Sequence, residues 1–465
     1  MGSTAPHSAT STLPTHDAKL AAVRARIAAS GGRFALRKRT ASNLFRYAPR
    51  RRDEGLARID LGVFNEILAL DRAAATLDVE GLATFESIVD YTLPRGFVPL
   101  VTPELKHITL GGASVGIGIE STCHRFGFVH DMLVEAEVLL PDGRIVTAAR
   151  EGEHADLFAA LGNSYGTLGY ILRAKIRLMP AKPYVGLEVT EHAEAGAFLD
   201  DLRRAADDLS VDFVESLMYA ADAARGTPDR LLAIASRFAD APPAGRAAED
   251  IIRKNVFYKL VSQPGTLWLT TKDYLFRYDP EWFWNIPDGL VYRLLRRWAP
   301  NAMRHSGFYK KWLHFQERWG ISQNDGKELL IQDWEVPWDK AEELLTYAMR
   351  EVDLDGKPWL SVAIRTPSAP TLYPLTPGTL YFNLGCYCRV PKPNPAEGKG
   401  DYWATRLLDA KCLELGGLKM LYSTSFMSEE EFDRIYNGAG QRALKAKYDP
   451  QGRFPTLYDK CVAGR

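Results

Sequence analysis

The sequence predicts an α+β protein of roughly two or three domains. It has 465 residues, 46% of them hydrophobic, which is enough to build a large core. Segments that alternate like strands and segments with apolar residues at helical spacing follow one another along the chain. Pro180 and Pro183 interrupt this pattern, so we expect a second region to begin there.

The first region has the clearest elements. Apolar residues at helical spacing predict a helix over Asp17–Ala29, which Gly31 and Gly32 end. Short strands are expected at Phe34–Leu36, Arg58–Leu61 and Thr76–Val79, and a helix at Leu82–Leu93. Further on we expect a hairpin of Val134–Leu140 and Arg144–Ala148, a helical turn at Asp156–Leu161, a glycine-bearing loop at Gly162–Gly169 and a strand at Tyr170–Leu178. The second region has strand-like segments at Val211–Ala220, Leu329–Trp334 and Thr379–Cys388.

Composition excludes several classes of protein. Lys plus Arg equals Asp plus Glu at 58 each, and this balance argues against a general nucleic-acid binder. Five cysteines, without the spacing of a zinc site, fit a reducing cytoplasm. The first residues are polar and no apolar run reaches the length of a membrane span, so we expect neither a signal peptide nor a transmembrane helix.

Four glycines gather in the segment Thr109–Glu120, at Gly111, Gly112, Gly116 and Gly118. Such density lets the backbone approach a ligand and leaves N–H groups free to hold phosphate oxygens. The segment lacks the strand–GxGxxG–helix arrangement of a Rossmann unit and the Gly-Lys-Ser/Thr of a P-loop. Taken alone it is equally compatible with a tight turn.

Three features in order narrow this choice. They are the polar loop Arg37–Asn43, the segment Gly111–Gly127, and Gly166-Thr167-Leu168-Gly169 before a strand. In order and spacing they resemble the vanillyl-alcohol-oxidase type of two-lobed FAD-binding domain. In that family the first two features wrap the pyrophosphate of FAD, and the third approaches the cofactor from the other lobe. The resemblance assigns FAD contacts to Arg37, Lys38, Thr40, Ser42, Asn43, Gly111, Gly112, Ser114, Val115, Gly116, Gly118, Ile119, Ser121, His124, Gly166, Thr167, Gly169 and Ile171.

Longer motifs resemble one branch of that family, the Δ24-sterol reductases (Diminuto). They are Val101–Leu105, Thr109–Gly112, Gly116–Gly127, Gly166–Tyr170, Pro180–Tyr184, Ile331–Asp333 and Phe454–Lys460. The branch implies an enzyme that uses NAD(P)H to reduce an isolated carbon–carbon double bond in a lipid. The sterol enzymes carry an N-terminal membrane anchor, and we expect none here. The first loop is also more basic, with an Arg50–Arg52 run that suits either a solvated surface or a phosphate contact.

The resemblance also bears on how FAD is held. Several oxidases of the wider family bind the flavin covalently through a histidine near the position of Glu120. A glutamate is not expected to form that bond, so FAD should be non-covalent. His124 lies four residues further on and is expected to be a polar residue satisfied by hydrogen bonds near the cofactor.

Reduction of an alkene needs a hydride and a proton, so we looked for acids that could be positioned near the flavin. The catalytic candidates are Glu120, Tyr387, Tyr422 and Asn383, with Asp333, Arg365 and Lys419 as further possibilities. If Tyr381 to Tyr387 is one regular strand, Tyr381, Asn383 and Tyr387 share a face, whereas a bulge at Gly385 would break that register. The alternative for each tyrosine is a core residue with a satisfied hydroxyl.

The stretch Trp282–Trp319 combines tryptophans with Lys and Arg. Such a mixture suits contact with a membrane surface, and it also suits a helical cap over the substrate domain. Ala- and Arg-rich composition suggests a bacterial source, where sterols are unusual. We therefore expect reduction of a methylene-branched fatty acyl chain to a methyl-branched product of the 10-methylstearate type, after a methyltransferase has added the methylene.

Three alternatives remain open: a Δ24-sterol-type reductase, a flavin oxidase or dehydrogenase of an alcohol or sugar, and a non-catalytic module that binds a membrane or a partner. The expected location is the cytoplasm, with peripheral contact at the inner face of the membrane. The expected organisation is a disordered tail at 1–17, an FAD-binding domain at 18–182, a substrate or cap domain at 183–410, and a C-terminal segment at 411–465 that packs back near the flavin.

Overall fold

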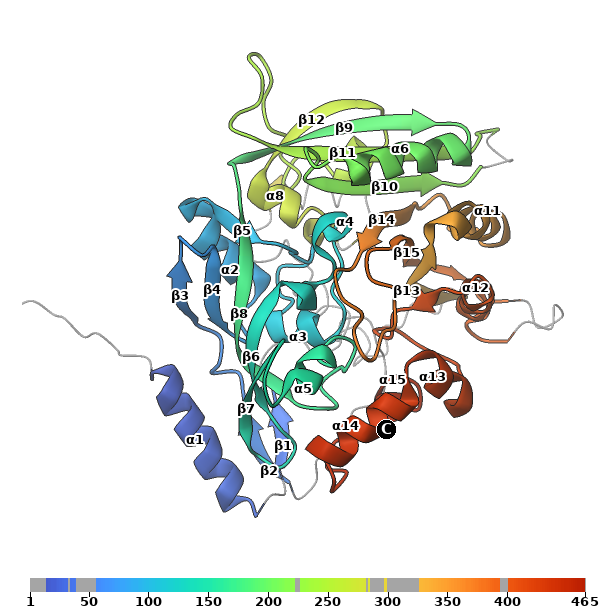
Figure 1. Ribbon diagram of the computed structural model, residues 1–465. Coiled ribbons are helices and arrows are strands. Elements are labelled where there is room, and N and C mark those ends of the chain that lie inside the picture. The colour runs from blue at the N-terminus through green and yellow to red at the C-terminus, as the bar shows by residue number, and fades with distance from the viewer. Residues whose placement is uncertain are drawn as a thin grey trace, which may run out of the picture.

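A computed structural model describes residues 14–31, 34–38, 56–221, 226–281, 283–284, 297–298, 326–393 and 400–464. Within these ranges the chain forms two large antiparallel β-sheets with helices around them (Figure 1). The first sheet has the order β3-β4-β8-β6-β7, with β5 on β8, and the second the order β12-β9-β11-β10-β14-β15-β13-β16. A separate pair, β1 and β2, is parallel. The predicted α+β class is confirmed.

The first part of the chain contains the first sheet. Its elements are α1 (His16–Ala29), β1 (Phe34–Arg37), β2 (Ala57–Asp60), β3 (Ile67–Asp71), β4 (Thr76–Glu80), α2 (Phe85–Thr92), η1 (Leu93–Arg95), β5 (Phe97–Pro99), α3 (Leu110–Val115), α4 (Cys123–Phe126), η2 (Val129–Met132), β6 (Leu133–Leu139), β7 (Ile145–Ala149), α5 (Ala155–Ala159) and β8 (Tyr170–Pro180).

The second sheet and its helices follow. The elements are β9 (Tyr184–His192), α6 (Ala195–Asp207), β10 (Phe213–Tyr219), β11 (Arg230–Ala239), α7 (Phe257–Leu260), β12 (Gly265–Thr270), α8 (Thr271–Leu275), η3 (Asp279–Glu281), β13 (Lys327–Pro337), η5 (Trp338–Lys340), α11 (Ala341–Glu351), β14 (Trp359–Arg365), β15 (Leu380–Pro391), α12 (Trp403–Glu414) and β16 (Leu418–Lys419). The chain ends with α13 (Glu429–Ile435), α14 (Gly438–Tyr448) and α15 (Leu457–Cys461).

The elements predicted in the first region are present, with small shifts at their ends. The first helix starts at His16 because the Thr15 side chain accepts the Ala18 N–H, and it buries its apolar stripe. The helix expected from Leu82 starts only at Phe85, because Thr84 caps it by accepting the Ser87 N–H. The strands β3 and β5 and the short helices α3 and α4 were not predicted, and α3 lies inside the glycine segment.

Strand β15 is regular. It pairs with β13 without a break from Pro391 opposite Lys327 to Tyr381 opposite Pro337. A bulge at Gly385 is therefore excluded, and the regular register that we considered is the correct one. Because side chains alternate along a strand, Tyr381, Asn383 and Tyr387 lie on one face of the sheet.

The two faces of the second sheet have different neighbours. Helices α6, α11 and α12 cover one face (Figure 1), where Trp334 and Phe382 belong to a separate apolar core. The opposite face contributes Tyr381 and Tyr387 to the core that also contains the first sheet. Polar side chains on this second face therefore lie between the two sheets.

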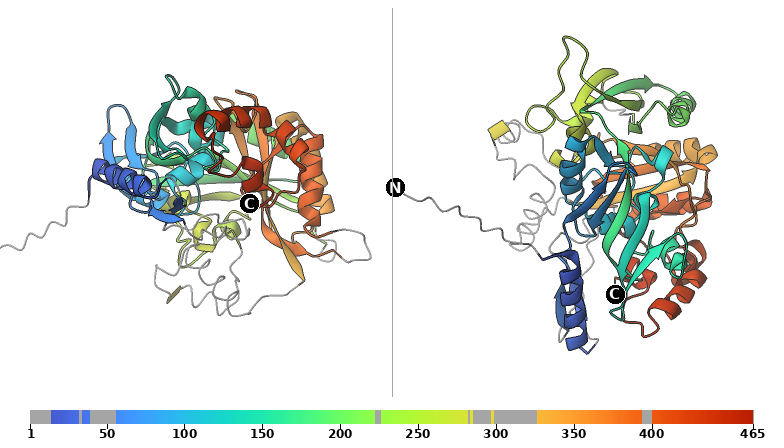
Figure 2. Two further views of the ribbon diagram at one scale, coloured as in Figure 1. Left: turned by 90° about the horizontal axis from the view of Figure 1, so that it is seen from below. Right: turned by 60° about the vertical axis from the view of Figure 1, so that its left-hand side comes forward.

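Direct contacts hold the two sheets together. The Val214 N–H in β10 donates to the Ser121 carbonyl at 2.8 Å, and α4 packs against β14. The C-terminal helices, red in Figures 1 and 2, lie beside the first sheet, where the Tyr448 hydroxyl donates to Asp156 Oδ1 at 2.6 Å. No helix in the described ranges is long and apolar enough to cross a membrane.

Candidate functional site

Glycines in the first sheet allow backbones to pack against one another. A Cβ at Gly81 would lie 2.0 Å from the Ile171 carbonyl oxygen, and a Cβ at Gly111 would lie 2.9 Å from the Gly81 carbonyl oxygen. A Cβ at Gly118 would lie 2.7 Å from Val129 Cγ2. These positions need glycine for contacts within the protein, a reason that the sequence pattern did not reveal.

The two predicted glycine loops are joined directly. The Tyr165 backbone N–H donates to the Val115 carbonyl at 2.9 Å, and the Tyr165 hydroxyl donates to the Gly116 carbonyl at 3.1 Å. Ile117 and Tyr165 both have left-handed backbones, with φ of 53° and 49°. For a β-branched residue such as Ile117 this conformation costs of the order of 1–3 kcal/mol, and such strain clusters at ligand sites.

This pair of loops fits a phosphate-bearing cofactor. A left-handed residue after a right-handed one turns successive N–H groups to the same side, an arrangement that binds anions. Within the described part of the chain, the buried Ser114 hydroxyl has no hydrogen-bond partner. The loops therefore offer the uncommitted Ser114 hydroxyl to a pyrophosphate, whereas the Gly116 and Gly118 N–H groups already donate to the Ala113 carbonyl.

Lys38, Arg37 and His124, which are also assigned to FAD, lie in different surroundings. Lys38 is half-buried and its Nζ lies 5.4 Å from the centre of the Tyr170 ring, and burial lowers its pKa. Arg37 ends β1 as an exposed residue. His124 has its Nδ1 3.0 Å from the Ser121 carbonyl oxygen, and burial lowers its pKa to about 4, so the ring is neutral at pH 7. Thr40, Ser42 and Asn43 lie outside the described residues.

A buried arginine lies where the two sheets meet. Arg277, which follows α8, has a fully buried side chain, and its Nη2 contacts Glu104 at 3.2 Å, Glu120 at 2.7 Å and Glu215 at 2.9 Å. Glu215 extends from β10, so it is the partner from the second sheet. The Tyr274 hydroxyl donates to the other oxygen of Glu215 at 2.9 Å. We call these five residues the Arg277 cluster.

The Arg277 cluster contains more carboxyl groups than cations. Burial raises the pKa of Glu120, while Arg277 opposes that rise. Burial and the neighbouring Glu120 carboxylate raise the pKa of Glu104 well above its usual range, although Arg277 again opposes the change. Burial therefore favours the protonated forms of Glu104 and Glu120, and Arg277 favours their charged forms.

A second group of polar side chains lies on the same side of the second sheet. Asp333 in β13 accepts hydrogen bonds at Oδ2 from Tyr387 at 2.7 Å and from Tyr422 at 2.6 Å. Gly385 lies directly opposite Asp333 in β15, and a Cβ there would come within 2.5 Å of Asp333 Oδ1. The missing side chain at Gly385 thus makes room for the carboxyl group. We call Asp333, Tyr387 and Tyr422 the Asp333 cluster.

Neighbouring side chains extend the Asp333 cluster. Asn383 donates to Glu335 Oε1 at 2.9 Å, and the Tyr373 hydroxyl donates to the other oxygen of Glu335. Burial, together with the nearby Asp333 charge, raises the pKa of Glu335 to about 8. The ring of Phe283 stacks on Tyr387, with 4.0 Å between ring centres and an angle of 8°.

The structure thus brings some of the candidates together and separates others. Tyr387 and Tyr422 meet on Asp333, with Asn383 nearby on the same strand face, whereas Glu120 belongs to the Arg277 cluster. Arg365 instead pairs with Asp207 at 2.7 Å, and the buried Lys419 pairs with Asp409 at 2.8 Å. Each ion pair balances the charge of a side chain outside the two clusters.

Sequence reasoning missed Arg277, Glu104 and Glu215. One signal was available: Glu215 is the single charged residue in the buried strand Phe213–Tyr219, and a buried charge needs a partner. The identity of that partner depends on contacts across 62 residues, which no local pattern contains.

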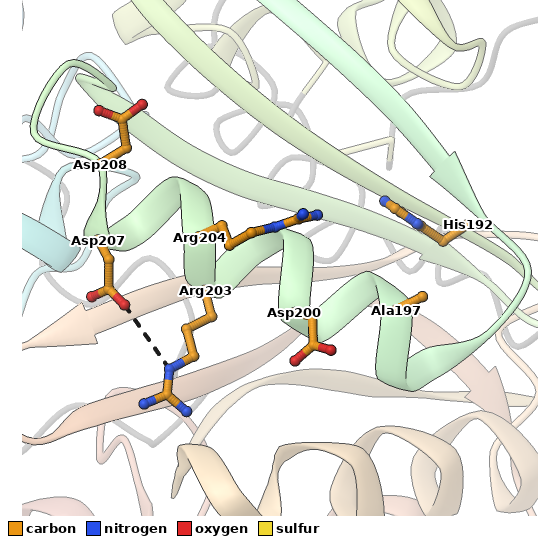
Figure 3. A pocket seen from close by; sticks show the side chains of 7 residues that line it. All are labelled: His192, Ala197, Asp200, Arg203, Arg204, Asp207 and Asp208. Atoms are coloured by element: carbon orange, nitrogen blue, oxygen red, sulfur yellow. Dashed lines mark ion pairs between the residues drawn. The ribbon is translucent and has the colours of Figure 1, made fainter.

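An open depression of about 740 Å³ lies elsewhere, on α6 (Figure 3). It is lined by charged side chains of both signs that point in different directions, and Arg203 pairs with Asp207 at its edge. It lies on the outer helix layer, on the opposite side of the second sheet from the Arg277 and Asp333 clusters, so we do not assign the chemistry to it.

Comparison with known proteins identifies the cofactor. Residues 12–149, which include the glycine segment, match the family described as FAD binding domain. The chain is an FAD-dependent oxidoreductase. The predicted cofactor and the predicted domain type are thereby confirmed.

Similarity to individual proteins extends over most of the chain. The chain is 27% identical to the Delta(24)-sterol reductase of Homo sapiens over 419 residues, and the match covers 86% of this chain and 77% of the relative. It is 25% identical to the Delta(24)-sterol reductase of Pisum sativum over 450 residues, covering 88% and 76%. A shorter match is to cytokinin dehydrogenase 7 of Oryza sativa subsp. japonica. It has 29% identity over 147 residues and covers 31% of this chain and 28% of the relative. The predicted branch, that of the Δ24-sterol reductases, is supported.

Proposed function

We propose that this oxidoreductase reduces an isolated carbon–carbon double bond in a lipid with NAD(P)H as the hydride source. The observation that carries the proposal is the similarity to Delta(24)-sterol reductases, which extends over 86% and 88% of this chain in the Homo sapiens and Pisum sativum relatives. The Asp333 cluster supports it, because two hydroxyl groups are held on one buried carboxyl group on the sheet face that meets this domain.

The residues present suit non-covalent binding of FAD between the two sheets. When bound, FAD would supply the hydride-transfer chemistry that links NAD(P)H to the substrate. Tyr387 and Tyr422 orient their hydroxyl groups through Asp333, and Asn383 positions the neighbouring Glu335. Glu120 is held by Arg277 and by the Ser121 N–H, so we assign it an electrostatic role beside the flavin rather than a covalent one.

We propose the domain boundaries that the sequence suggested, with an FAD-binding domain at 18–182, a substrate or cap domain at 183–410 and a C-terminal segment at 411–465. They are supported by the strands, because those of the first sheet end at Pro180 and those of the second begin at Tyr184. Lys445 donates to the Thr167 carbonyl at 3.4 Å, which favours a C-terminal segment near the cofactor loops.

For the substrate we propose a methylene-branched fatty acyl chain of a phospholipid, reduced to the methyl-branched product. A reaction that adds the methylene carbon, catalysed by a methyltransferase, would then have to precede this one. A Δ24-unsaturated sterol fits the named relatives equally well, so both lipids belong in the same assay.

A lipid substrate requires contact with a membrane or a carrier, and we propose that residues 282–319 provide it at the inner face of the membrane. Trp298 supports this, since 81% of its surface is exposed. Phe283 and Trp284 are buried instead, as a cap over the substrate domain would require. The rest of this stretch lies outside the described residues.

Vesicle binding tests that contact. Flotation with vesicles of anionic phospholipid should be weaker for Trp298→Ala than for the wild type, while Leu209→Ala, another exposed apolar residue, should bind like the wild type. Equal flotation of the Trp298→Ala variant and the wild type would contradict a role for this residue.

The function is tested by two separate half-reactions. The purified protein is mixed anaerobically with NADPH and with NADH, and bleaching of the flavin is followed. Vesicles of a methylene-bearing acyl phospholipid, or a Δ24-unsaturated sterol, are then added, and reoxidation is followed together with the gain of two hydrogens in the product. Tyr387→Phe and Tyr422→Phe should slow reoxidation, whereas Tyr347→Phe on helix α11 should not.

The outcomes separate the alternatives. Absence of bleaching by either nicotinamide would contradict a reductase. Fast reoxidation by air without an alkene would indicate an oxidase of an alcohol or sugar, and a colourless protein that binds no added FAD would indicate a non-catalytic module.

A further inference from the structure

The Arg277 cluster places three carboxyl groups around one guanidinium group. The Glu120 and Glu215 side chains are almost completely buried, and the third, Glu104, is 13% exposed. Burial of uncompensated charge is costly, and a buried acid normally avoids it by keeping its proton. One cation cannot neutralise three carboxylates, so at least one of the three acids stays protonated.

Hydrogen bonds indicate which acid that is. Glu215 accepts from Arg277 Nε at 3.0 Å and Nη2 at 2.9 Å, and also from the Tyr274 hydroxyl. Glu120 accepts from Arg277 at 2.7 Å and from the Ser121 N–H at 2.7 Å. Among the described residues, Glu104 accepts one hydrogen bond, from Arg277 at 3.2 Å. Both hydrogen bonds to Glu120 end on Oε1, and within the same residues its Oε2 has no partner. Since hydrogen bonds to a carboxylate stabilise its charged form, Glu104, with the fewest, is the least stabilised anion of the three.

Glu104 is also the member of the Arg277 cluster that interacts electrostatically with both Asp333 and Tyr387 of the Asp333 cluster. Its charge raises the pKa of Tyr387, after burial and Asp333, and the Asp333 charge in turn contributes to the raised pKa of Glu104. Its side chain is the most open of the three acids in the Arg277 cluster. It precedes the glycine segment by a few residues, so it extends from the FAD binding domain toward the second sheet.

We propose that Glu104 is the acid that protonates the substrate carbon. The proposal rests on the reductase function proposed above. In the step, the hydride forms one C–H bond, and the π electrons of the alkene take the proton from the Glu104 carboxyl group to form the other. NAD(P)H is oxidised and the alkene is reduced. Glu104 is left as a carboxylate, which Arg277 stabilises until a proton returns from solvent.

The test separates hydride uptake from proton delivery. In Glu104→Gln, bleaching of the flavin by NADPH or NADH should change less than about two-fold, while reoxidation by the methylene-bearing phospholipid or the Δ24 sterol should slow by about 100-fold or more, as for loss of a general acid. Glu104→Asp keeps the acid and should be faster than Glu104→Gln. Glu86→Gln, a half-exposed acid 3.7 Å from Lys106, serves as the matched control and should behave like the wild type.

A spectroscopic measurement is independent of turnover. The infrared carbonyl stretch of protonated carboxyl groups at neutral pH should lose one component in Glu104→Gln and none in Glu86→Gln. Equal reoxidation rates of Glu104→Gln and the wild type, or an unchanged carboxyl band, would overturn the assignment and leave the reductase function intact. A wild-type protein whose reduced flavin no alkene reoxidises would overturn both.

Discussion

Replacing Arg277 with methionine removes the cation that three buried carboxyl groups share. The side chain keeps its apolar volume but loses the hydrogen bonds to Glu104, Glu120 and Glu215. A carboxyl group with the usual pKa of 4.5 that must take up a proton at pH 7 costs about 3.4 kcal/mol, at about 1.36 kcal/mol per pH unit. That value lies within the ~3–5 kcal/mol found when one partner of a buried ion pair is removed.

The size of this loss depends on pH. In the variant the folded-state pKa of these acids lies above the unfolded-state value, so the folded state binds more protons and loses stability as the pH rises above 4.5. At pH 5 the cost of protonating one acid falls to about 0.7 kcal/mol. We therefore expect the loss in unfolding free energy to shrink markedly between pH 7 and pH 5.

Urea unfolding, followed by tryptophan fluorescence at both pH values, measures this loss. Arg350→Met is the control, because Arg350 is exposed, pairs with the adjacent Glu351 and lies 5.5 Å from the Tyr347 ring, and its replacement should cost less than about 0.5 kcal/mol. A loss for Arg277→Met below about 1 kcal/mol at pH 7, or one that is equal at both pH values, would refute the reasoning on buried charge.

Three further outcomes follow from the same geometry. Gly385→Ala forces a Cβ to within 2.5 Å of Asp333 and should cost about 1–3 kcal/mol in urea unfolding, whereas Gly400→Ala, with open space around it, should cost little; equal costs would contradict the packing argument. The pKa of Glu335 is raised to about 8, so the unfolding free energy of the wild type should fall from pH 5 to pH 8. The difference in unfolding free energy between Glu335→Gln and the wild type should shift in favour of the variant over that range, and parallel pH curves would exclude an acid titrating there. Gly81→Ala places a Cβ 2.0 Å from a carbonyl oxygen of β8 and should reduce the FAD retained through purification, measured by absorbance; full retention would show that the strands can separate without loss of the cofactor site.

The parts of the site that depend on one strand or one turn were predictable from the sequence. The shared face of Tyr387 and Asn383 follows from the two-residue period of a strand, and the observed register of β15 agrees with it. Asp333 was among the candidate acids, but its role as the common acceptor of two hydroxyl groups depends on β13 pairing with β15 and on the segment after β16.

The parts that depend on distant contacts were not predictable. The glycines of the segment Thr109–Glu120 suggested close approach to a ligand, yet Gly111 is needed where the backbone of Gly81, 30 residues earlier, passes close to it. Likewise, Arg277 gave no local signal, because an arginine among aromatic residues is equally compatible with a surface position. Its burial results from three acids contributed by three separate segments.

The Arg277 cluster also has a consequence for the order of folding. Its ion pairs close loops in which the partners are separated by 173, 157 and 62 residues. Closing such loops costs entropy before any contact is gained, so interactions of this kind generally form late. Each sheet also joins distant strands, as where Glu215 in β10 pairs with Val362 in β14, but the chemistry of the site requires in addition that the two sheets have met. Mutations in the cluster should therefore accelerate unfolding more than they slow refolding, and the last structure to form would be the one on which catalysis depends.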